Sequence, residues 1–253
     1  MKKIMIGMFS LFMLGMITAC GQGQSNGEDK PVLEMATSAD FPPFETRDEK
    51  GEIVGFDIDL AKYIANELGY ELEIKDMNFD GLIGALQSDR VDFVTSGMSA
   101  TDERKKSVDF SEEYHRSGEM FVTLKGSEVT SVDQLGGKKI GVQLGTIQDE
   151  GAKKIAEQLG NLEVKPLNKV PELIQELKSN RIDAVYLDKT VALGYIKELD
   201  LAGFDDESEV TPGMAIAFPK GNELIEDFNK VIIEMKENGE LEKLEKKWLD
   251  EQE

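Results

Sequence analysis

The chain has 253 residues, a formal net charge of −21 and a single cysteine. Such an acidic composition is a poor match for nucleic acid, whose phosphates require a basic surface, so no nucleic-acid partner is expected. With one cysteine there is no intrachain disulfide, and the length suits one large domain or two lobes of ordinary size.

The N-terminal segment has the features of an export signal. Two lysines precede an apolar run over residues 4–17 that is too short to span a membrane, so we interpret residues 1–19 as a signal peptide. The run ends in Ile-Thr-Ala-Cys20, which resembles a bacterial lipobox and implies diacylglycerol on Cys20. The alternative, a buried core thiol, fits poorly beside the polar, glycine-rich residues that follow, and residues 20–30 are expected to form a flexible tether. The mature protein is then expected at the extracellular face of the cell membrane, held by lipid alone.

The first elements after the tether alternate between strands and helices. Hydrophobic runs and helical spacing predict a strand at 32–37, a short hairpin near 50–55, a helix that ends at Gly69, a strand at 71–75 and a helix from Phe79 to about 88. Residues 38–45 form a loop that two prolines stiffen and that carries two aromatic residues. Phe41 is placed to lie over a ligand, whereas Phe44 is expected in the core.

Residues 95–104 are suited to the capture of a small anion. They follow a buried strand at 91–94, are rich in small and hydroxylated residues, and end at Arg104. A guanidinium clamps a carboxylate through two parallel hydrogen bonds, and a loop at the end of a strand adds N–H groups and hydroxyls, so Ser96, Ser99 and Arg104 are the candidates. The alternative is that Asp102 caps a short helix at 102–106 whose charges face water.

An internal repeat indicates two similar lobes. Leu-Ile-Gly-Ala-Leu-Gln-Ser-Asp-Arg-Val-Asp-Phe-Val at 82–94 recurs as Leu-Ile-Gln-Glu-Leu-Lys-Ser-Asn-Arg-Ile-Asp-Ala-Val at 173–185, each a helix, a polar turn and a buried strand. Ligands gather at the carboxyl ends of strands in open α/β sheets, which places Asp188 opposite Arg104 across a cleft. An arginine for the carboxylate and an aspartate for the ammonium group suit an α-amino acid. The alternative for Asp188 is an N-cap of the helix that starts near Thr190.

The remaining pattern completes the second lobe and returns to the first. Strands are predicted at 119–124, 139–142, 162–166 and 214–218, helices at about 149–159, 190–199, 224–238 and 241–248, and an acidic loop at 205–209. The helix start at Thr146 and Ile147 offers free N–H groups that could share the anion with Arg104. If the chain crosses near 120–125 and 214–220, lobe 1 comprises 31–122 and 219–253, lobe 2 comprises 123–218, and the crossings are a hinge.

Several motifs together resemble one protein family. They are Ser-Ala-Asp-Phe-Pro-Pro-Phe-Glu45, Val-Gly-Phe-Asp-Ile-Asp-Leu60, Ser-Gly-Met-Ser-Ala-Thr-Asp-Glu-Arg-Lys-Lys106, Val-Asp-Phe-Ser111, Gly-Val-Gln-Leu-Gly-Thr-Ile-Gln148, Ala-Phe-Pro-Lys-Gly221 and Glu-Asn-Gly239. Over essentially all of the chain after Cys20 they resemble the polar amino-acid solute-binding proteins (family 3 type) of ABC importers, and the motif ending at Gln148 is most similar to the arginine-binding lipoproteins of Gram-positive bacteria. The resemblance implies an α/β, two-lobed periplasmic-binding-protein-like fold of type II, in which each lobe is an open sheet flanked by helices and two strands form the hinge.

The resemblance also implies roles for individual residues. Arg104 and the Thr146 and Ile147 amides would hold the α-carboxylate. Asp188 would hold the α-ammonium group with Ser96, Gly97 and Ser99, while Phe41 and Phe79 would sandwich the side chain.

One residue departs from the family pattern. Several relatives selective for basic amino acids or glutamine have an aspartate where this chain has Ser38. A cationic ligand side chain would then need a nearby acid or an amide oxygen. The candidates are Asp40, Glu45, Asp57, Gln143 and Gln148. Arginine or another basic amino acid is the expected ligand, with glutamine or cystine as the alternative.

The expected activity is capture and delivery rather than catalysis. A monomeric binder would pass its amino acid to an ABC permease with its ATPase. Dehydratase-like enzymes and sensor modules on the same scaffold are the competing classes. The only histidine, His115, is expected to pack, and no Ser–His–Asp set, metal-ligand cluster or phosphate loop is apparent, so neither an enzyme activity nor a cofactor or metal is expected.

Overall fold

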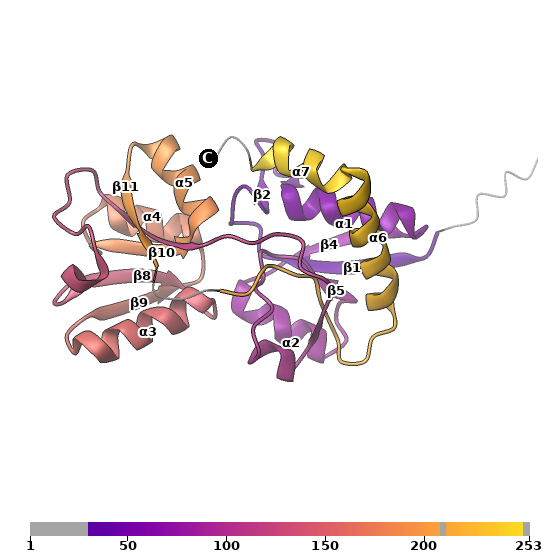
Figure 1. Ribbon diagram of the computed structural model, residues 1–253, viewed down its shortest axis with the longest axis horizontal. Coiled ribbons are helices and arrows are strands. Elements are labelled where there is room, and N and C mark those ends of the chain that lie inside the picture. Colours follow the sequence, from indigo (N-terminus) through magenta and orange to yellow (C-terminus); the bar gives the residue numbers. More distant parts are fainter. Residues whose placement is uncertain (1–29, 208–210, 250–253) are drawn as a thin grey trace, which may run out of the picture.

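The computed structural model describes residues 30–207 and 211–249, arranged as two lobes side by side (Figure 1). The predicted signal peptide, Cys20 and the tether up to residue 29 lie outside the described residues. Among the helices that the structure describes, none is long and apolar enough to cross a membrane.

Lobe 1 is built on a mixed five-stranded sheet. Its order is β4 (Glu71–Asp76), β1 (Val32–Thr37), β5 (Phe93–Val94), β12 (Ala217–Phe218) and β6 (Asp109–Phe110). β1 is parallel to both β4 and β5, whereas β12 is antiparallel to β5 and β6. The predicted hairpin is present as β2 (Thr46–Arg47) and β3 (Ile53–Val54).

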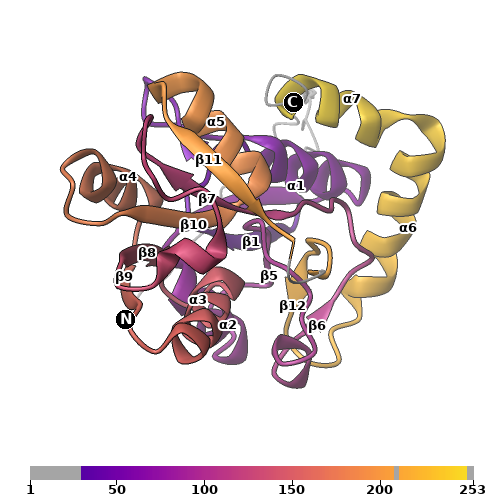
Figure 2. The same ribbon diagram turned by 60° about the vertical axis from the view of Figure 1, so that its left-hand side comes forward.

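Helices cover the sheet of lobe 1 because their apolar residues recur at helical spacing. They are α1 (Phe56–Glu67), α2 (Leu82–Gln87), which a 3₁₀ turn at Phe79–Gly81 precedes, α6 (Leu224–Asn238) and α7 (Glu240–Trp248). In α1, Ile58, Ala61 and Ile64 are fully buried on one face. Figure 2 shows α6 and α7 running along the outer side of this lobe next to α1.

Lobe 2 has a second mixed sheet. Its order is β11 (Ala202–Asp206), β7 (Glu119–Thr123), β10 (Ala184–Asp188), β8 (Lys139–Gln143) and β9 (Glu163–Leu167). Three helices pack on it: α3 (Ile147–Leu159), α4 (Val170–Lys178) and α5 (Lys189–Leu199). The two-lobed α/β fold that the sequence predicts is therefore confirmed.

The internal repeat is a structural repeat as well. Its copies form α2 with β5 and α4 with β10, one in each lobe. The turn between helix and strand contains Asp89 in the first copy and Asn180 in the second, and both have positive φ angles, of 50° and 55°. Aspartate and asparagine tolerate this left-handed conformation better than most residues, which explains the same turn at the same position.

The predicted lobe boundaries are wrong by several residues. A boundary after residue 122 cuts β7, which pairs with β10 and β11 of lobe 2. A boundary after residue 218 assigns β12 to lobe 2, although it pairs with β5 and β6 of lobe 1. The sequence pattern shows that a segment is a strand, but it does not show which sheet the strand joins.

The two crossings therefore lie nearer the middle of the molecule and pair with each other. The Tyr114 N–H donates to the Met214 carbonyl at 2.9 Å, and the Met214 N–H donates to the His115 carbonyl at 2.8 Å. The Ser111 N–H reaches the Ile216 carbonyl at 2.9 Å. In Figure 1 these segments run between the lobes below the label of α5 and above that of α2.

The predicted acidic loop at 205–209 is wrong where the structure describes it. Asp205 and Asp206 belong to β11, opposite Met120 and Glu119 of β7. Asp206 is buried and accepts the Tyr186 hydroxyl at 2.6 Å, whereas Asp205 pairs with Lys189 at 2.8 Å. An edge strand can carry such charges because its outer side is not paired with another strand.

Candidate functional site

A cavity lies between the lobes and is lined by residues of both. Lobe 1 contributes Phe41, Phe79, Gly97, Ser99 and Arg104, lobe 2 contributes Gln143, Thr146, Ile147, Gln148 and Asp188, and the second crossing contributes Met214. Ten of the thirteen candidates from the sequence thus meet at one cavity. Ser38, Glu45 and Ser96 do not line it, for reasons given below.

Arg104 connects the two lobes. It begins a 3₁₀ turn at Arg104–Lys106, and its guanidinium donates to the Ser99 carbonyl at 2.9 Å and, across the cleft, to the Gly145 carbonyl at 3.1 Å. The guanidinium carbon lies 5.3 Å from the centre of the Phe79 ring. Burial lowers the pKa of Arg104 to about 10, so the group is still cationic at neutral pH.

The alternative interpretation of this stretch is only partly right. Asp102, Lys105 and Lys106 are exposed, as a solvated turn requires. However, Thr101 rather than Asp102 accepts the Arg104 N–H, at 3.2 Å, and Arg104 itself lines the cavity.

The N-terminus of α3 faces the same cavity. Thr146 is its N-cap: the hydroxyl accepts the Asp149 N–H at 3.2 Å and donates to the Gln143 carbonyl at 2.7 Å. The Thr146 N–H also points to that carbonyl, at 3.4 Å. The Thr146 donors are therefore engaged within the protein in this structure. Ile147 is the first helical residue, where N–H groups have no helical acceptor.

Asp188 both caps a helix and lines the cavity. Its Oδ1 atom accepts the Thr190 N–H at 2.8 Å and the Val191 N–H at 3.3 Å, so the N-cap interpretation is correct. Only 4% of the residue is exposed, and burial raises the pKa of Asp188 to about 7 despite those hydrogen bonds. A cation beside it would favour the ionised carboxylate.

Glu119 adds a second buried acid that the sequence analysis did not single out. It lies opposite Asp188 in the antiparallel pair of β7 and β10. Burial, together with the charge of Asp188, raises the pKa of Glu119 to about 8. Its carboxylate accepts the Nε2 group of Gln148, which lines the cavity. The sequence offered one signal for Glu119, because an acidic residue at the start of a buried hydrophobic strand is unusual.

A buried acid pair lies beneath the loop that carries Gly97 and Ser99. The Ser96 hydroxyl donates to Glu45 at 2.8 Å, and the Gly97 N–H donates to Asp57 at 2.7 Å. Glu45 and Asp57 are both fully buried, and burial raises both pKa values, that of Asp57 to about 7. Glu45 and Ser96 therefore support the loop from behind and do not form the cavity wall, and Asp57 does not line the cavity either.

The two aromatic candidates lie on the wall that lobe 1 contributes. Phe41 is 8% exposed and packs against Phe44, with ring centres 6.0 Å apart, while Phe79 is 9% exposed. Phe44 is fully buried, as expected for a core residue. The rings of Phe41 and Phe79 are thus available to an apolar or planar ligand side chain, because both line the cavity.

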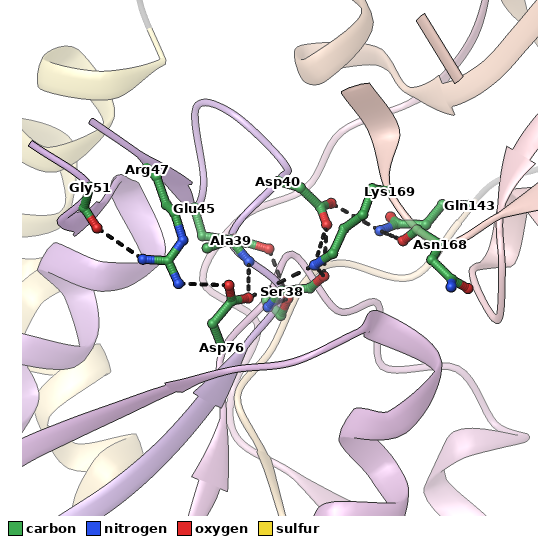
Figure 3. Close-up of polar contacts among 11 residues, drawn as sticks. Ser38, Ala39, Asp40, Glu45, Arg47, Gly51, Asp76, Gln143, Asn168 and Lys169 are labelled. Carbon is green, nitrogen blue, oxygen red and sulfur yellow. Dashed lines mark hydrogen bonds and ion pairs between the residues drawn. The ribbon is translucent and has the colours of Figure 1, made fainter. Parts of the chain in front are cut away.

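A polar network closes the cleft between Ser38 and the start of α4 (Figure 3). Asp40 of lobe 1 accepts the Gln143 Nε2 group at 3.0 Å and the Lys169 ammonium at 2.8 Å, both from lobe 2. The Ser38 hydroxyl donates to Asp40 at 3.1 Å. Ser38 is 1% exposed and lies behind the cavity wall, within this network. Burial raises the pKa of Asp40, although the ion pair with Lys169 opposes the shift.

Sequence reasoning also missed Met214 and Lys169. Met214 lies within a predicted strand, where a methionine is normally read as core. Lys169 precedes a helix, where a lysine normally faces solvent, and only the contact across the cleft distinguishes it. In the part of the chain that the structure describes, no cluster of histidine, cysteine or acidic residues could hold a metal ion.

Comparison with known proteins shows which family this chain resembles. The family model described as bacterial extracellular solute-binding proteins, family 3, matches residues 33–251. The arginine-binding extracellular protein ArtP of Bacillus subtilis (strain 168) is 46% identical over 98% of this chain and 98% of its own. An ancestral arginine-binding protein has been solved bound to arginine and bound to glutamine. Each structure is 45% identical and covers 87% of this chain; the TM-scores are 0.83 and 0.82, over 99% and 98% of those chains.

Proposed function

The chain belongs to the bacterial extracellular solute-binding proteins of family 3, and on that premise we propose that it captures a polar amino acid between its lobes and delivers it to an ABC permease. The observation that carries the proposal is that Arg104 of lobe 1 and Asp188 of lobe 2 line the same cavity. A guanidinium complements an α-carboxylate, and a buried aspartate complements an α-ammonium group.

The charges of the cavity support a zwitterionic ligand. Asp188 and Glu119 are buried, and no described lysine or arginine contributes to either pKa. Among the described residues, the Arg104 guanidinium donates hydrogen bonds only to carbonyl groups. Buried charges are costly unless they are paired, so a ligand that carries both signs satisfies both walls at once.

We assign arginine, or another basic amino acid, as the preferred ligand. Phe41 and Phe79 offer faces on which a guanidinium can stack, and Gln143 and Gln148 bring amide groups to the cavity. The B. subtilis relative and one of the solved relatives are named for arginine, which is consistent with this assignment. Glutamine is the alternative, because an ancestral arginine-binding protein was also solved with glutamine bound.

A thermal-shift screen tests the assignment. The purified protein is heated with each of the twenty amino acids and with ornithine, citrulline and cystine. A ligand that binds only the folded state raises the melting temperature by mass action. The largest shift is expected for arginine, with smaller shifts for lysine and ornithine. A shift with glutamine or cystine alone would reassign the ligand, and no shift with any of them would remove the proposal.

The protein is proposed to act without catalysis. Of the described residues that line the cavity, only Arg104 and Asp188 have ionisable side chains, and a zwitterion engages both. His115 lies outside the cavity wall, packs 5.3 Å from the Phe44 ring, and has its pKa lowered by burial to about 4. Mass spectrometry of each bound ligand after prolonged incubation should show it unchanged, and a time-dependent product would restore the enzyme class.

The proposal also includes a lipid anchor and a monomeric protein. Cys20, outside the described residues, would carry the lipid that holds the protein at the extracellular face of the cell membrane. In cells, the Cys20→Ala variant should appear in the medium rather than in the membrane fraction. Membrane retention of that variant would contradict the anchor, and deletion of the protein should reduce uptake of its amino acid.

A further inference from the structure

The amide of Gln143 is held in one orientation by its surroundings. Its Nε2 group donates to the Asp40 carboxylate at 3.0 Å and to the Asn168 carbonyl at 3.1 Å. Both partners are acceptors, so the amide cannot turn over without placing its oxygen against two other oxygens. Gln143 is 3% exposed, and leaving those buried acceptors without a donor would be costly.

The oxygen of the same amide is therefore available to a ligand in the cavity. Gln143 lines the cavity, and no residue that the structure describes donates a hydrogen bond to its Oε1 atom. Gln143 ends β8, the strand between β10, which carries Asp188, and β9. Gln143 thus lies on the β9 side of Asp188, the residue proposed to hold the α-ammonium group of the ligand.

Asp40 itself is fully engaged. Besides Gln143, it accepts the Lys169 ammonium at 2.8 Å and the Ser38 hydroxyl at 3.1 Å, and it does not line the cavity. Lys169 also lies 3.9 Å from Asp76, so its charge is balanced on the lobe 1 side. Figure 3 shows the Asp40 carboxylate facing both Lys169 and Gln143, with Ser38 below. The charge of Asp40 is compensated before any ligand binds.

We propose that Asp40, held in place by Lys169 across the cleft, is a positioning residue that fixes the Gln143 amide with its oxygen toward the cavity and thereby selects ligand side chains that end in N–H donors. The inference rests on the proposed function. In this inference the Gln143 amide oxygen, and not the Asp40 carboxylate, contacts the end of the ligand side chain. That oxygen distinguishes side chains that end in hydrogen-bond donors from those that end in acceptors.

The ligand class that follows is specific. Arginine, citrulline and glutamine all end in N–H donors that a carbonyl oxygen can accept. Glutamate has nearly the shape of glutamine but ends in acceptors only, so it would face the Gln143 oxygen without a proton between them. Sites built around buried hydrogen bonds reject a mismatched analogue strongly, and wild-type protein should prefer glutamine to glutamate on the order of 100-fold.

The test compares dissociation constants, by titration calorimetry, for arginine, citrulline, glutamine and glutamate. In the double variant Asp40→Asn with Lys169→Met both charges are removed together. The asparagine amide accepts either orientation of Gln143, so only the Asn168 carbonyl still favours the original one. The preference for glutamine over glutamate should fall about tenfold or more, while the ratio of arginine to citrulline changes less than about threefold. A merely structural role would weaken glutamine and glutamate equally.

The matched control is Asp76→Asn, which removes the other acid near Lys169 but leaves the contacts of Gln143 with Asp40 and Asn168 intact. It should keep the wild-type preference. A second variant, Gln143→Met, keeps the length of the side chain and removes the amide. It should also abolish the preference for glutamine over glutamate, so the proposal stays testable if the double variant does not fold.

The outcomes separate this inference from the proposed function. If wild-type protein binds none of the four amino acids, both fail. If it binds them but the double variant and Gln143→Met keep the wild-type preference, the amino-acid site stands and the positioning role is overturned. If the double variant loses arginine affinity much more than citrulline affinity, Asp40 acts directly on the ligand cation and the proposal is wrong.

Discussion

Asp188 and Glu119 lie directly opposite each other on the antiparallel strands β10 and β7, and both are buried. Opposite residues in an antiparallel pair project from the same face of the sheet, so the two acids are neighbours. Like charges in this arrangement destabilise a sheet unless a proton or a cation lies between them. The wall of lobe 2 is therefore complementary to the ammonium group of a ligand.

Replacing Asp188 with asparagine should separate its two roles. The asparagine oxygen still caps α5, so the melting temperature without ligand should change little. The charge is lost, and arginine should bind roughly 100-fold more weakly or worse because a buried ammonium loses its partner. Calorimetry and a thermal scan of the same sample measure both. A large loss of ligand-free stability with unchanged affinity would mean that capping is the only role.

Ligand affinity should depend on pH through the same carboxyl. The pKa of Asp188 is raised from 3.8 to about 7, so the folded protein holds this proton more tightly than the unfolded chain does. For this group, stability without ligand is therefore lost as the pH rises from about 4 to about 7. An ammonium ligand binds the ionised carboxylate, so its affinity shows the opposite trend.

Titrations with arginine at pH 5, 6, 7 and 8 measure this dependence. Affinity should fall by up to about tenfold for each pH unit below 7, with a proton released on binding. Asp188→Asn should have a much shallower profile. Constant affinity from pH 5 to pH 8 in wild-type protein would contradict the assignment of the ammonium site.

Removing the guanidinium should abolish the carboxylate site. Arg104→Ala is expected to weaken arginine binding by roughly 2–5 kcal/mol, because a desolvated carboxylate loses its charged partner. Arg104→Lys should recover only part of the loss, since an ammonium cannot form the bidentate pair. Lys105→Ala, in the same turn but exposed, is the control and should bind normally. Undiminished affinity in Arg104→Ala would remove the clamp.

Gly97 should be required for binding as well as for stability. Its φ is +52°, and a Cβ atom there would lie 3.0 Å from Cε1 of Phe41 on the cavity wall. Gly97→Ala should therefore cost about 1 kcal/mol of stability and also displace Phe41, which weakens ligand binding. Gly69→Ala has the same kind of strain, with φ +80°, but open space around it. It should lose stability and keep its affinity; equal affinities in the two variants would show that Phe41 is unaffected.

The sequence was a good guide where chemistry and periodicity agreed. The repeat at 82–94 and 173–185 predicted both helix–turn–strand units, and the rule that ligands gather at strand ends brought Arg104 and Asp188 to one cavity. It failed where partners are set by packing over long distances. The sheet that β7 joins, the edge strand formed by Asp205 and Asp206, and the contact of Lys169 with Asp40 depend on residues that are distant in the chain.

The same limit explains the misplaced candidates. Ser96 was a candidate for its hydroxyl at a strand end, Glu45 as an acid for a cationic ligand side chain, and Ser38 as the position where several relatives have an aspartate. Their side chains, however, form hydrogen bonds behind the cavity wall. The Ser96 hydroxyl donates to Glu45, and the Ser38 hydroxyl donates to Asp40. Loop position alone does not tell which side of a wall a polar side chain occupies.

Calorimetric titration of the purified protein with arginine, agmatine and Nα-acetylarginine tests the central claim most directly. Agmatine lacks the carboxylate that Arg104 would hold, and Nα-acetylarginine lacks the ammonium group that Asp188 would hold. The account predicts one arginine bound per chain and at least about 100-fold weaker binding of both analogues. Agmatine or Nα-acetylarginine binding as tightly as arginine would contradict recognition of the α-amino-acid group.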